Sequence, residues 1–212
     1  MYVPRIHEEN RLDVLHSLIA GHPLGTWVEA GEAELLVNHV PFVLDPSRGK
    51  YGTLMGHVAR ANPVWKAARA SVAGVVTFRG PQTYVTPSWY PSKHQHGKAV
   101  PTWNYAVVAA HGRPRFIEER DWLYAHLREL TETHEQSQAL PWSLDDAPPD
   151  FTEKLVTAIV GVEIPIERLE GKWKTSQNRP LQDKLGVVAG LLGQGDDESA
   201  AMAGLVRQHI DG

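Results

Sequence analysis

The sequence predicts a mainly β protein in which antiparallel strands form a small closed barrel with flanking helices. Short strand-like runs follow one another without the regular strand–helix alternation of a doubly wound sheet. Seven or eight such runs, separated by turn residues, are typical of antiparallel barrels. A chain of 212 residues with 42% hydrophobic residues is also long enough to bury a sizeable core without disulfides, and it has no cysteine.

In the N-terminal half, apolar residues at 12, 15, 18 and 19 have helical spacing, and Gly21 ends that helix. A turn at 30–32 between two apolar runs predicts a hairpin. Pro63 indicates a helix start. We expect, in order, a helix over 10–19, strands over 26–30, 33–40 and 53–58, and a short helix over 63–70.

The C-terminal half returns to strands, interrupted by two helical patterns and followed by a helical tail. Pro165 predicts that its strand lies at an edge or a bulge. We expect strands over 73–80, 82–86, 102–112, 113–119 and 161–171, helices over 122–135 and 151–160, and a tail from Leu181 broken at 193–195. Residues 1–179 would form the barrel domain, and 180–212 a helical extension of it.

Composition limits the partners that this chain is expected to have. The formal charge of −4 gives no overall attraction to nucleic acid, so direct DNA binding is doubtful. No apolar run of 18 residues is present, and the first 13 residues lack a signal-peptide pattern. We therefore expect a cytoplasmic protein without a membrane segment.

Residues 78–105 are the most unusual stretch, because they hold 6 of the 17 aromatic residues together with prolines and neutral polar side chains. Flat rings beside hydrogen-bonding groups suit a planar ligand with polar edges. The alternative is a proline-braced loop that covers the end of a sheet. Both interpretations stay open at this point.

Two polar segments could meet such a ligand. At 56–63 a strand ends before Pro63, so that backbone N–H groups and Arg60 could bind a phosphate; alternatively, Arg60 is simply solvated. At 172–179 an extended chain would place Lys172 and Lys174 on one face and Trp173 toward the core. The alternative for this segment is a charged surface loop anchored by one tryptophan.

Other patterns predict little chemistry. His94 and His96 have no third ligand at metal spacing, so we expect no metal. The glycines at 190–195 lack dinucleotide-binding spacing, and no nucleophile motif surrounds Ser88. Catalytic residues therefore stay unknown.

Six blocks of sequence resemble the PaiB family of FMN-binding negative transcriptional regulators, which is related to the protease synthase and sporulation regulator. They extend from the first residue to about 179 and read MYVP, NHVPF, GHVARANPVW, GPQTYVTPSWY, VPTWNYAVV and LEGKWKTSQNR. The chain departs from the family at His7 and Val162, where phenylalanine is usual, and at Gln82, where histidine is usual.

This resemblance implies a split β-barrel similar to flavin reductases, a homodimer, and FMN in a cleft between the subunits. Arg60 and Asn62 would contact the phosphate or ribityl chain. The expected cofactor-binding residues are Asn38, His39, His57, Arg60, Asn62, Trp103, Asn104, Lys174, Gln177 and Asn178.

Three functions stay open at this stage. The first is an FMN-binding protein, which could be an FMN-dependent oxidoreductase of unknown substrate, with the reaction supplied by the cofactor. The second is a transcriptional regulator without flavin; since no basic helix-turn-helix stands out, it would act indirectly or through a partner. The third is a barrel that binds haem through His39 or His57.

Overall fold

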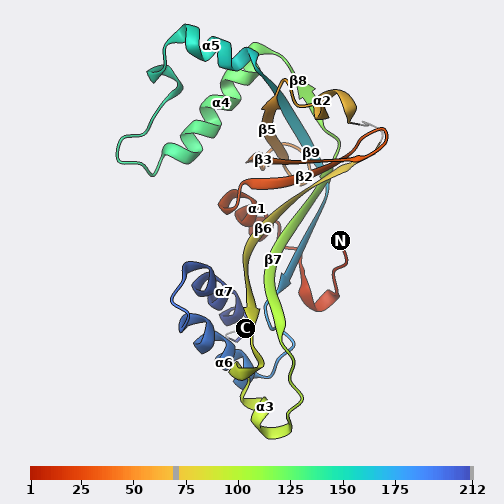
Figure 1. Ribbon diagram of the computed structural model, residues 1–212, viewed down its shortest axis with the longest axis vertical. Helices are drawn as coiled ribbons and strands as arrows, with labels where there is room; N and C mark the ends of the chain where they lie inside the picture. Colours follow the sequence, from red (N-terminus) through yellow and green to blue (C-terminus); the bar gives the residue numbers. More distant parts are fainter. Residues whose placement is uncertain (69–71, 211–212) are drawn as a thin grey trace. The chain divides into compact units, whose positions relative to one another are not determined.

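The computed structural model describes residues 1–68 and 72–210, so the end of the helix predicted over 63–70 lies outside the described residues. Figure 1 shows the elements along the chain. The strands are β1 (Glu8–Glu9), β2 (Leu24–Ala30), β3 (Leu35–Pro41), β4 (Val43–Asp45), β5 (Thr53–Ala59), β6 (Gly74–Val85), β7 (Thr102–Gly112), β8 (Arg115–Ile117) and β9 (Ile159–Lys174). The helices are α1 (Leu12–Gly21), α2 (Val64–Ala67), α3 (Pro91–His96), α4 (Arg120–Glu135), α5 (Pro149–Thr157), α6 (Leu181–Leu192) and α7 (Asp197–Arg207), with 3₁₀ turns η1 (Arg5–His7), η2 (Pro87–Trp89) and η3 (Leu144–Asp146).

Hydrogen bonds link the strands in the order β3-β2-β6-β7-β9-β5-β4, and β1 and β8 also pair with β9. The pairings of β2 with β3 and β6, of β5 with β4 and β9, and of β1 and β8 with β9 are antiparallel. The predicted class, mainly β with flanking helices, is confirmed. Closure is not: the ends of the strand order, β3 and β4, do not pair with each other in the described part of the chain.

The chain divides into two compact units. One, here called the helical unit, comprises residues 1–21, 79–108 and 170–212. The other, called the hairpin unit, comprises 22–78 and 109–169. The three long strands β6, β7 and β9 each contribute residues to both units. The predicted boundary at 179/180 stays a prediction.

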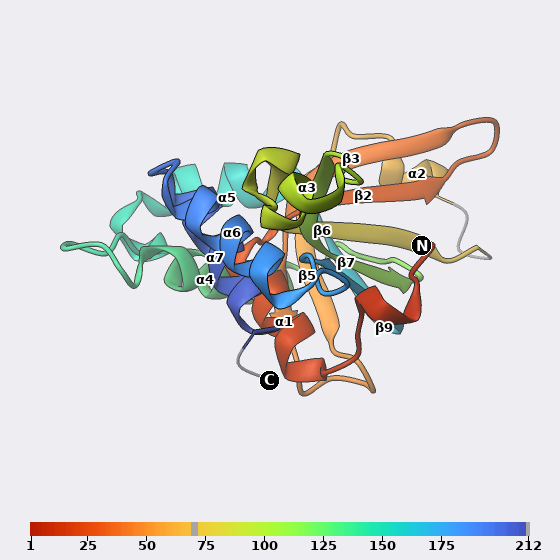
Figure 2. The same ribbon diagram turned by 90° about the horizontal axis from the view of Figure 1, so that it is seen from below.

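In the hairpin unit, the core includes side chains from the β2–β3 hairpin, which Figure 2 shows as two long paired strands. Trp27 from β2 is fully buried and lies against Phe116 of β8, with ring centroids 6.2 Å apart. Phe42 and Phe78 meet edge to face at 6.1 Å. Such aromatic pairs add to the free energy that their buried area contributes to folding.

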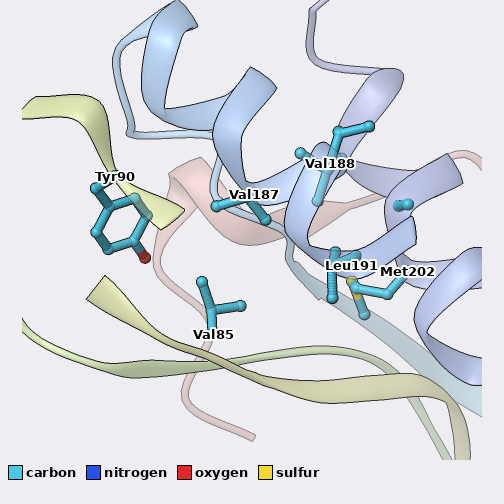
Figure 3. Packing of buried hydrophobic residues seen from close by; sticks show 8 residues of the cluster. Val85, Tyr90, Val187, Val188, Leu191 and Met202 are labelled. Carbon is cyan, nitrogen blue, oxygen red and sulfur yellow. The ribbon is translucent and has the colours of Figure 1, made fainter. Parts of the chain in front are cut away.

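In the helical unit, α6 and α7 pack on the end of β6 and on η2 (Figure 3). Val85, Tyr90, Val187, Leu191 and Met202 are fully buried in this cluster. A side chain at Gly190 of α6 would overlap the ring of Trp89, so glycine allows the helix to approach η2 closely. The helical tail predicted from Leu181 is thus an integral part of a core.

Two strand predictions need correction. The runs over 73–80 and 82–86 form one strand, β6, because its pairing with β2 ends at Thr77 and Pro81 lies beyond it. Of the two positions predicted for Pro165, an edge or a bulge, the edge is wrong, because β9 lies between β7 and β5. Since Pro165 pairs with Thr53 at the end of the β5 ladder, its missing N–H interrupts little. No helix in the described ranges is both long and apolar enough to span a membrane.

Candidate functional site

The predicted site residues divide evenly between the two units. Each group is described within its own unit. The hairpin unit holds Asn38, His39, His57, Arg60 and Asn62, and the helical unit holds Trp103, Asn104, Lys174, Gln177 and Asn178.

The end of β9 in the helical unit turns through a buried polar segment. Ser176 has a φ of +62°, in the left-handed region that a non-glycine residue rarely adopts. Its hydroxyl accepts a hydrogen bond from Asn104 Nδ2 at 3.0 Å, and both residues are buried. The hydroxyl of Thr175 is also buried and has no hydrogen-bond partner among the described residues. A buried polar group of this kind is uncommon in folded proteins.

Gln177 fixes the shape of this turn. Its Oε1 accepts from the Thr175 N–H at 2.8 Å and lies 3.1 Å from His7 Nδ1, while its Nε2 donates to the Trp173 carbonyl. Burial lowers the pKa of His7, and the nearby Lys172 and Lys174 lower it further, against the raising effect of the bond to Gln177. Gln177 is therefore used inside the protein, and Asn178, beside it, is exposed.

Lys174 has no acidic partner in the described part of the chain. Its Nζ donates to the Thr102 hydroxyl at 2.5 Å, and no carboxylate pairs with it in the described ranges. As predicted, Trp173 is buried while Lys172 and Lys174 share the other face of the strand.

An exposed aromatic pair lies on β6 and β7 of the same unit. The Trp103 and Tyr84 side chains are 48% and 47% exposed, and their ring centroids lie 6.2 Å apart. The indole N–H of Trp103 donates to Gln82 Oε1 at 2.5 Å. The hydrogen bond holds in place a ring that would otherwise be free to rotate, with much of its surface open to a flat ligand.

In the hairpin unit, Arg60 uses its donors internally. Its Nε donates to the Thr157 carbonyl at 2.8 Å, and its two terminal nitrogens donate to Glu118 at 2.5 Å and to the Ile159 carbonyl at 3.1 Å. A phosphate at Arg60 would have to replace Glu118. The arginine instead ties the end of α5 to the turn after β5.

Of the remaining predicted residues of this unit, Asn38 and His39 lie on β3, and Asn62 lies in the turn between β5 and α2. Asn62 donates to Asn38 Oδ1 at 2.6 Å and accepts from the Val64 N–H at 3.0 Å, so that it also supports the start of α2. His39 is exposed on β3. The structure thus brings Asn38 and Asn62 together.

His57 forms a pair with a residue that sequence reasoning missed, His126 of α4. Its Nδ1 lies 3.1 Å from His126 Nε2, and the Trp122 ring stacks on His126 with centroids 5.1 Å apart. Burial, and then the neighbouring His57, lower the pKa of His126 to about 4. In the sequence, His126 is distinguished by its position among the apolar residues of an amphipathic helix, α4.

Trp122 connects this pair to an ion pair in which Glu163 is buried and Arg48 is partly exposed. Its indole N–H donates to Glu163 at 3.0 Å, and Glu163 accepts two bonds from Arg48, at 2.6 and 2.8 Å. The described residues contain no group of three or more acidic or histidine side chains placed to hold a metal.

Comparisons with known proteins agree with this fold. The chain is 28% identical over 210 residues to the protease synthase and sporulation protein PAI 2 of Bacillus subtilis, covering 99% of this chain and 98% of that protein. It is 35% identical over 243 residues to an uncharacterized protein of Emericella nidulans, covering 98% and 97%.

Among solved structures, the flavocytochrome Anf3 from Azotobacter vinelandii matches with a TM-score of 0.62 at 14% identity, covering 82% of this chain and 73% of that one. The FAD and heme binding protein from Mycobacterium smegmatis matches with a TM-score of 0.55 at 13% identity, covering 79% and 73%. At this identity the matches establish a shared fold.

The family model described as a putative FMN-binding domain matches residues 1–168. This match confirms the family expected from the sequence blocks and supports FMN as the cofactor. The chain therefore belongs to this putative FMN-binding domain family.

Proposed function

We propose that this protein binds FMN at the polar turn and aromatic pair of the helical unit. The observation that supports this most is the Thr175 hydroxyl, which is buried without a partner beside the strained Ser176. Strained backbone conformations and unsatisfied buried polar atoms cost free energy, so they persist only where the surrounding structure holds them, and they are concentrated at ligand sites.

The residues present fit the chemical groups of a flavin. The ring system presents carbonyl oxygens and nitrogens along one edge, and the Thr175 hydroxyl can both donate and accept a hydrogen bond but has no partner among the described residues. Trp103 offers a fixed aromatic surface to a planar ring. When bound, FMN would supply the redox chemistry, and the protein would supply binding and orientation.

Lys174 is the better candidate for the phosphate. A phosphate needs an available cation. Among the described residues, Lys174 is bonded only to a neutral hydroxyl, whereas Arg60 is paired with Glu118. We therefore assign phosphate recognition to Lys174, in place of the Arg60 expected from the sequence.

The test compares FMN with riboflavin, which lacks the phosphate. A charge-assisted hydrogen bond contributes about 1.5–3 kcal/mol, so Lys174→Met should weaken FMN about ten- to hundredfold and riboflavin little. Flavin fluorescence quenching and the visible spectrum measure both affinities. Lys172→Met is the matched control, since Lys172 lies on the same face of β9 but donates to the Tyr2 carbonyl.

Two outcomes would contradict the proposal at different levels. If the unmodified protein does not bind FMN, the proposal that it is an FMN-binding protein is wrong. An equal loss of FMN and riboflavin affinity in Lys174→Met would leave flavin binding intact but remove the phosphate role. Arg60→Met is expected to lower thermal stability without separating the two flavins, because its bonds are internal.

We also propose that the protein is a homodimer, with the flavin in the cleft between subunits that the resemblance implies. Support comes from β3, where Leu35 and Val37 are 69% and 57% exposed at the end of the strand order. Exposed apolar residues on an edge strand favour pairing with a second chain. Light scattering of the protein and of Leu35→Ser/Val37→Ser tests this; an unchanged mass in the variant would count against it.

If the protein regulates transcription, we propose that it does so through a partner protein. The overall charge is −4, and α7 begins with two acidic residues, Asp197 and Glu198. DNA binding requires a basic surface, which these features do not provide. A promoter fragment that binds the purified protein directly at physiological salt would contradict this.

A further inference from the structure

The hairpin unit contains an acidic helical insertion, residues 118–158, which the proposed flavin site does not use. It carries ten acidic and three basic residues, a net charge of −7, whereas the rest of the chain carries 18 basic and 15 acidic residues. The whole negative charge of the protein is therefore concentrated in the segment that contains α4, η3 and α5. The negative charge affects Glu129: burial raises its pKa, and the neighbouring carboxylates of Asp45 and Glu132 raise that pKa further.

Several of these acidic groups are already paired. Glu153 accepts from Arg120 and Tyr124, and Asp145 accepts two bonds from Arg128, both at 2.8 Å. Glu119, Asp121, Glu132 and Asp150 have no ion-pair partner among the described residues. These carboxylates are left to attract an external cation.

The same insertion exposes large apolar side chains. Phe151 and Leu155, one turn apart on α5, are 53% and 52% exposed, while Thr152 and Val156 of the same helix are buried. In the loop before α5, Leu140 is 90% and Trp142 is 45% exposed. The helix is therefore apolar on a face that the described residues of its own unit leave exposed.

A pocket of about 180 Å³ lies in the insertion, lined by residues of α4, η3 and α5 that include Arg120, Tyr124, Asp145 and Thr152. Its two charged groups are already paired, Arg120 with Glu153 and Asp145 with Arg128. The pocket therefore suits an apolar side chain of a docking segment, while the carboxylates without an ion-pair partner among the described residues attract its cationic groups.

From the charge, the apolar face and the pocket together, we infer that this insertion is a docking surface for a cationic amphipathic segment of another protein. An amphipathic helix lays its apolar face against exposed apolar residues, and complementary charge selects the partner and its orientation. Nucleic acid and anionic membrane are repelled by the charge of −7. This inference does not depend on flavin binding.

The probe is a fluorescein-labelled 18-residue peptide of leucine and lysine in helical spacing, with a second peptide in which glutamate replaces lysine. We expect the lysine peptide to bind the full-length protein at 50 mM NaCl, to bind less tightly at 500 mM, and the glutamate peptide not to bind. Fluorescence anisotropy measures the affinity, and ¹H–¹⁵N spectra should place the shifted amides within 118–158.

Two variants with matched controls localise the binding. Phe151→Ser/Leu155→Ser should weaken the lysine peptide at least tenfold, whereas Leu181→Ser/Leu185→Ser, an equally spaced exposed pair on α6, should not. Glu132→Gln/Asp150→Asn should weaken binding and reduce its salt dependence, whereas Asp197→Asn/Glu198→Gln on α7 should do neither. All eight positions can be changed without opening the core of either unit.

Three results would overturn the inference. Equal losses in the test and control pairs would mean that the peptide binds nonspecifically. Equal affinity for the glutamate peptide would remove the role of charge. A dimer that is lost in Phe151→Ser/Leu155→Ser would assign the surface to a second copy of this chain.

Discussion

Replacing Glu29 by glutamine should stabilise the protein at neutral and alkaline pH. The carboxyl of Glu29 lies on β2 in the hairpin unit with only 1% of the residue exposed. Its Oε2 accepts from the Trp27 indole N–H at 3.1 Å, but its Oε1 is buried and has no hydrogen-bond partner among the described residues. A carboxylate held in this way loses its hydration without full compensation.

The sign of the pH dependence follows from the raised pKa. Burial raises the pKa of Glu29, so the folded protein holds the proton more tightly than the unfolded chain. The contribution of Glu29 to the free energy of unfolding is fully present below the pKa that it has in the unfolded chain, and it is lost as pH rises through the pKa that it has in the folded protein. Glutamine stays neutral, so it avoids that loss.

The expected gain is about 2 kcal/mol at pH 8, the scale of one poorly satisfied buried group. For a protein of this length, that free energy raises the melting temperature by about 4–8 °C. Thermal unfolding followed by circular dichroism at pH 4, 6 and 8 measures it. The difference between the variant and the wild type should shrink toward zero at pH 4.

Glu163→Gln is the control with the opposite sign. The bonds from Arg48 lower the pKa of Glu163, so its contribution is present above the unfolded pKa and lost as pH falls through the folded pKa. Glu163→Gln should therefore destabilise the protein at pH 8. A Glu29→Gln variant that is less stable at every pH, or whose gain does not depend on pH, would refute the reasoning.

Two further predictions concern the histidine pair and its neighbour. Because the pKa of His126 is lowered to about 4, its contribution to the free energy of unfolding falls by roughly 3 kcal/mol as pH drops from 6.5 to 4. His126→Gln should therefore reduce the difference in unfolding free energy between pH 7.5 and pH 4.5, measured by urea unfolding. A methyl group at Gly161 would overlap the Trp122 ring, so Gly161→Ala should cost about 1–3 kcal/mol. Gly21→Ala, with open space around its Cβ position, is the control, and an equal loss in both variants would contradict the packing argument.

The sequence predicted well those features that depend on local pattern. The alternation of Lys172, Trp173 and Lys174 correctly predicted which side chain is buried, because a strand alternates its faces. The turn around Gly31 correctly predicted the β2–β3 hairpin, and the helical tail begins at Leu181 as expected. Family blocks with characteristic spacing identified the family, whose model matches residues 1–168.

What the sequence did not predict depends on contacts between distant residues. The internal bonds of Arg60 come from residues about one hundred positions away, at the end of α5. His126 meets His57 across 69 positions, and no local pattern distinguishes it from a core histidine. The prediction for Pro165 considered only the strand that contains it. Whether the absence of its backbone N–H matters depends on where the partner strand β5 ends.

The sharing of β6, β7 and β9 between the two units has a consequence for how the protein can come apart. The polypeptide passes from one unit to the other four times, at 21/22, 78/79, 108/109 and 169/170, and the last three passages lie inside strands. Neither unit can be cut out as a continuous piece of sequence, so neither is a module that evolution or a cloning experiment could transfer by itself. Unfolding of either unit disrupts three strands, β6, β7 and β9, that continue into the other unit. We therefore expect a single cooperative unfolding transition.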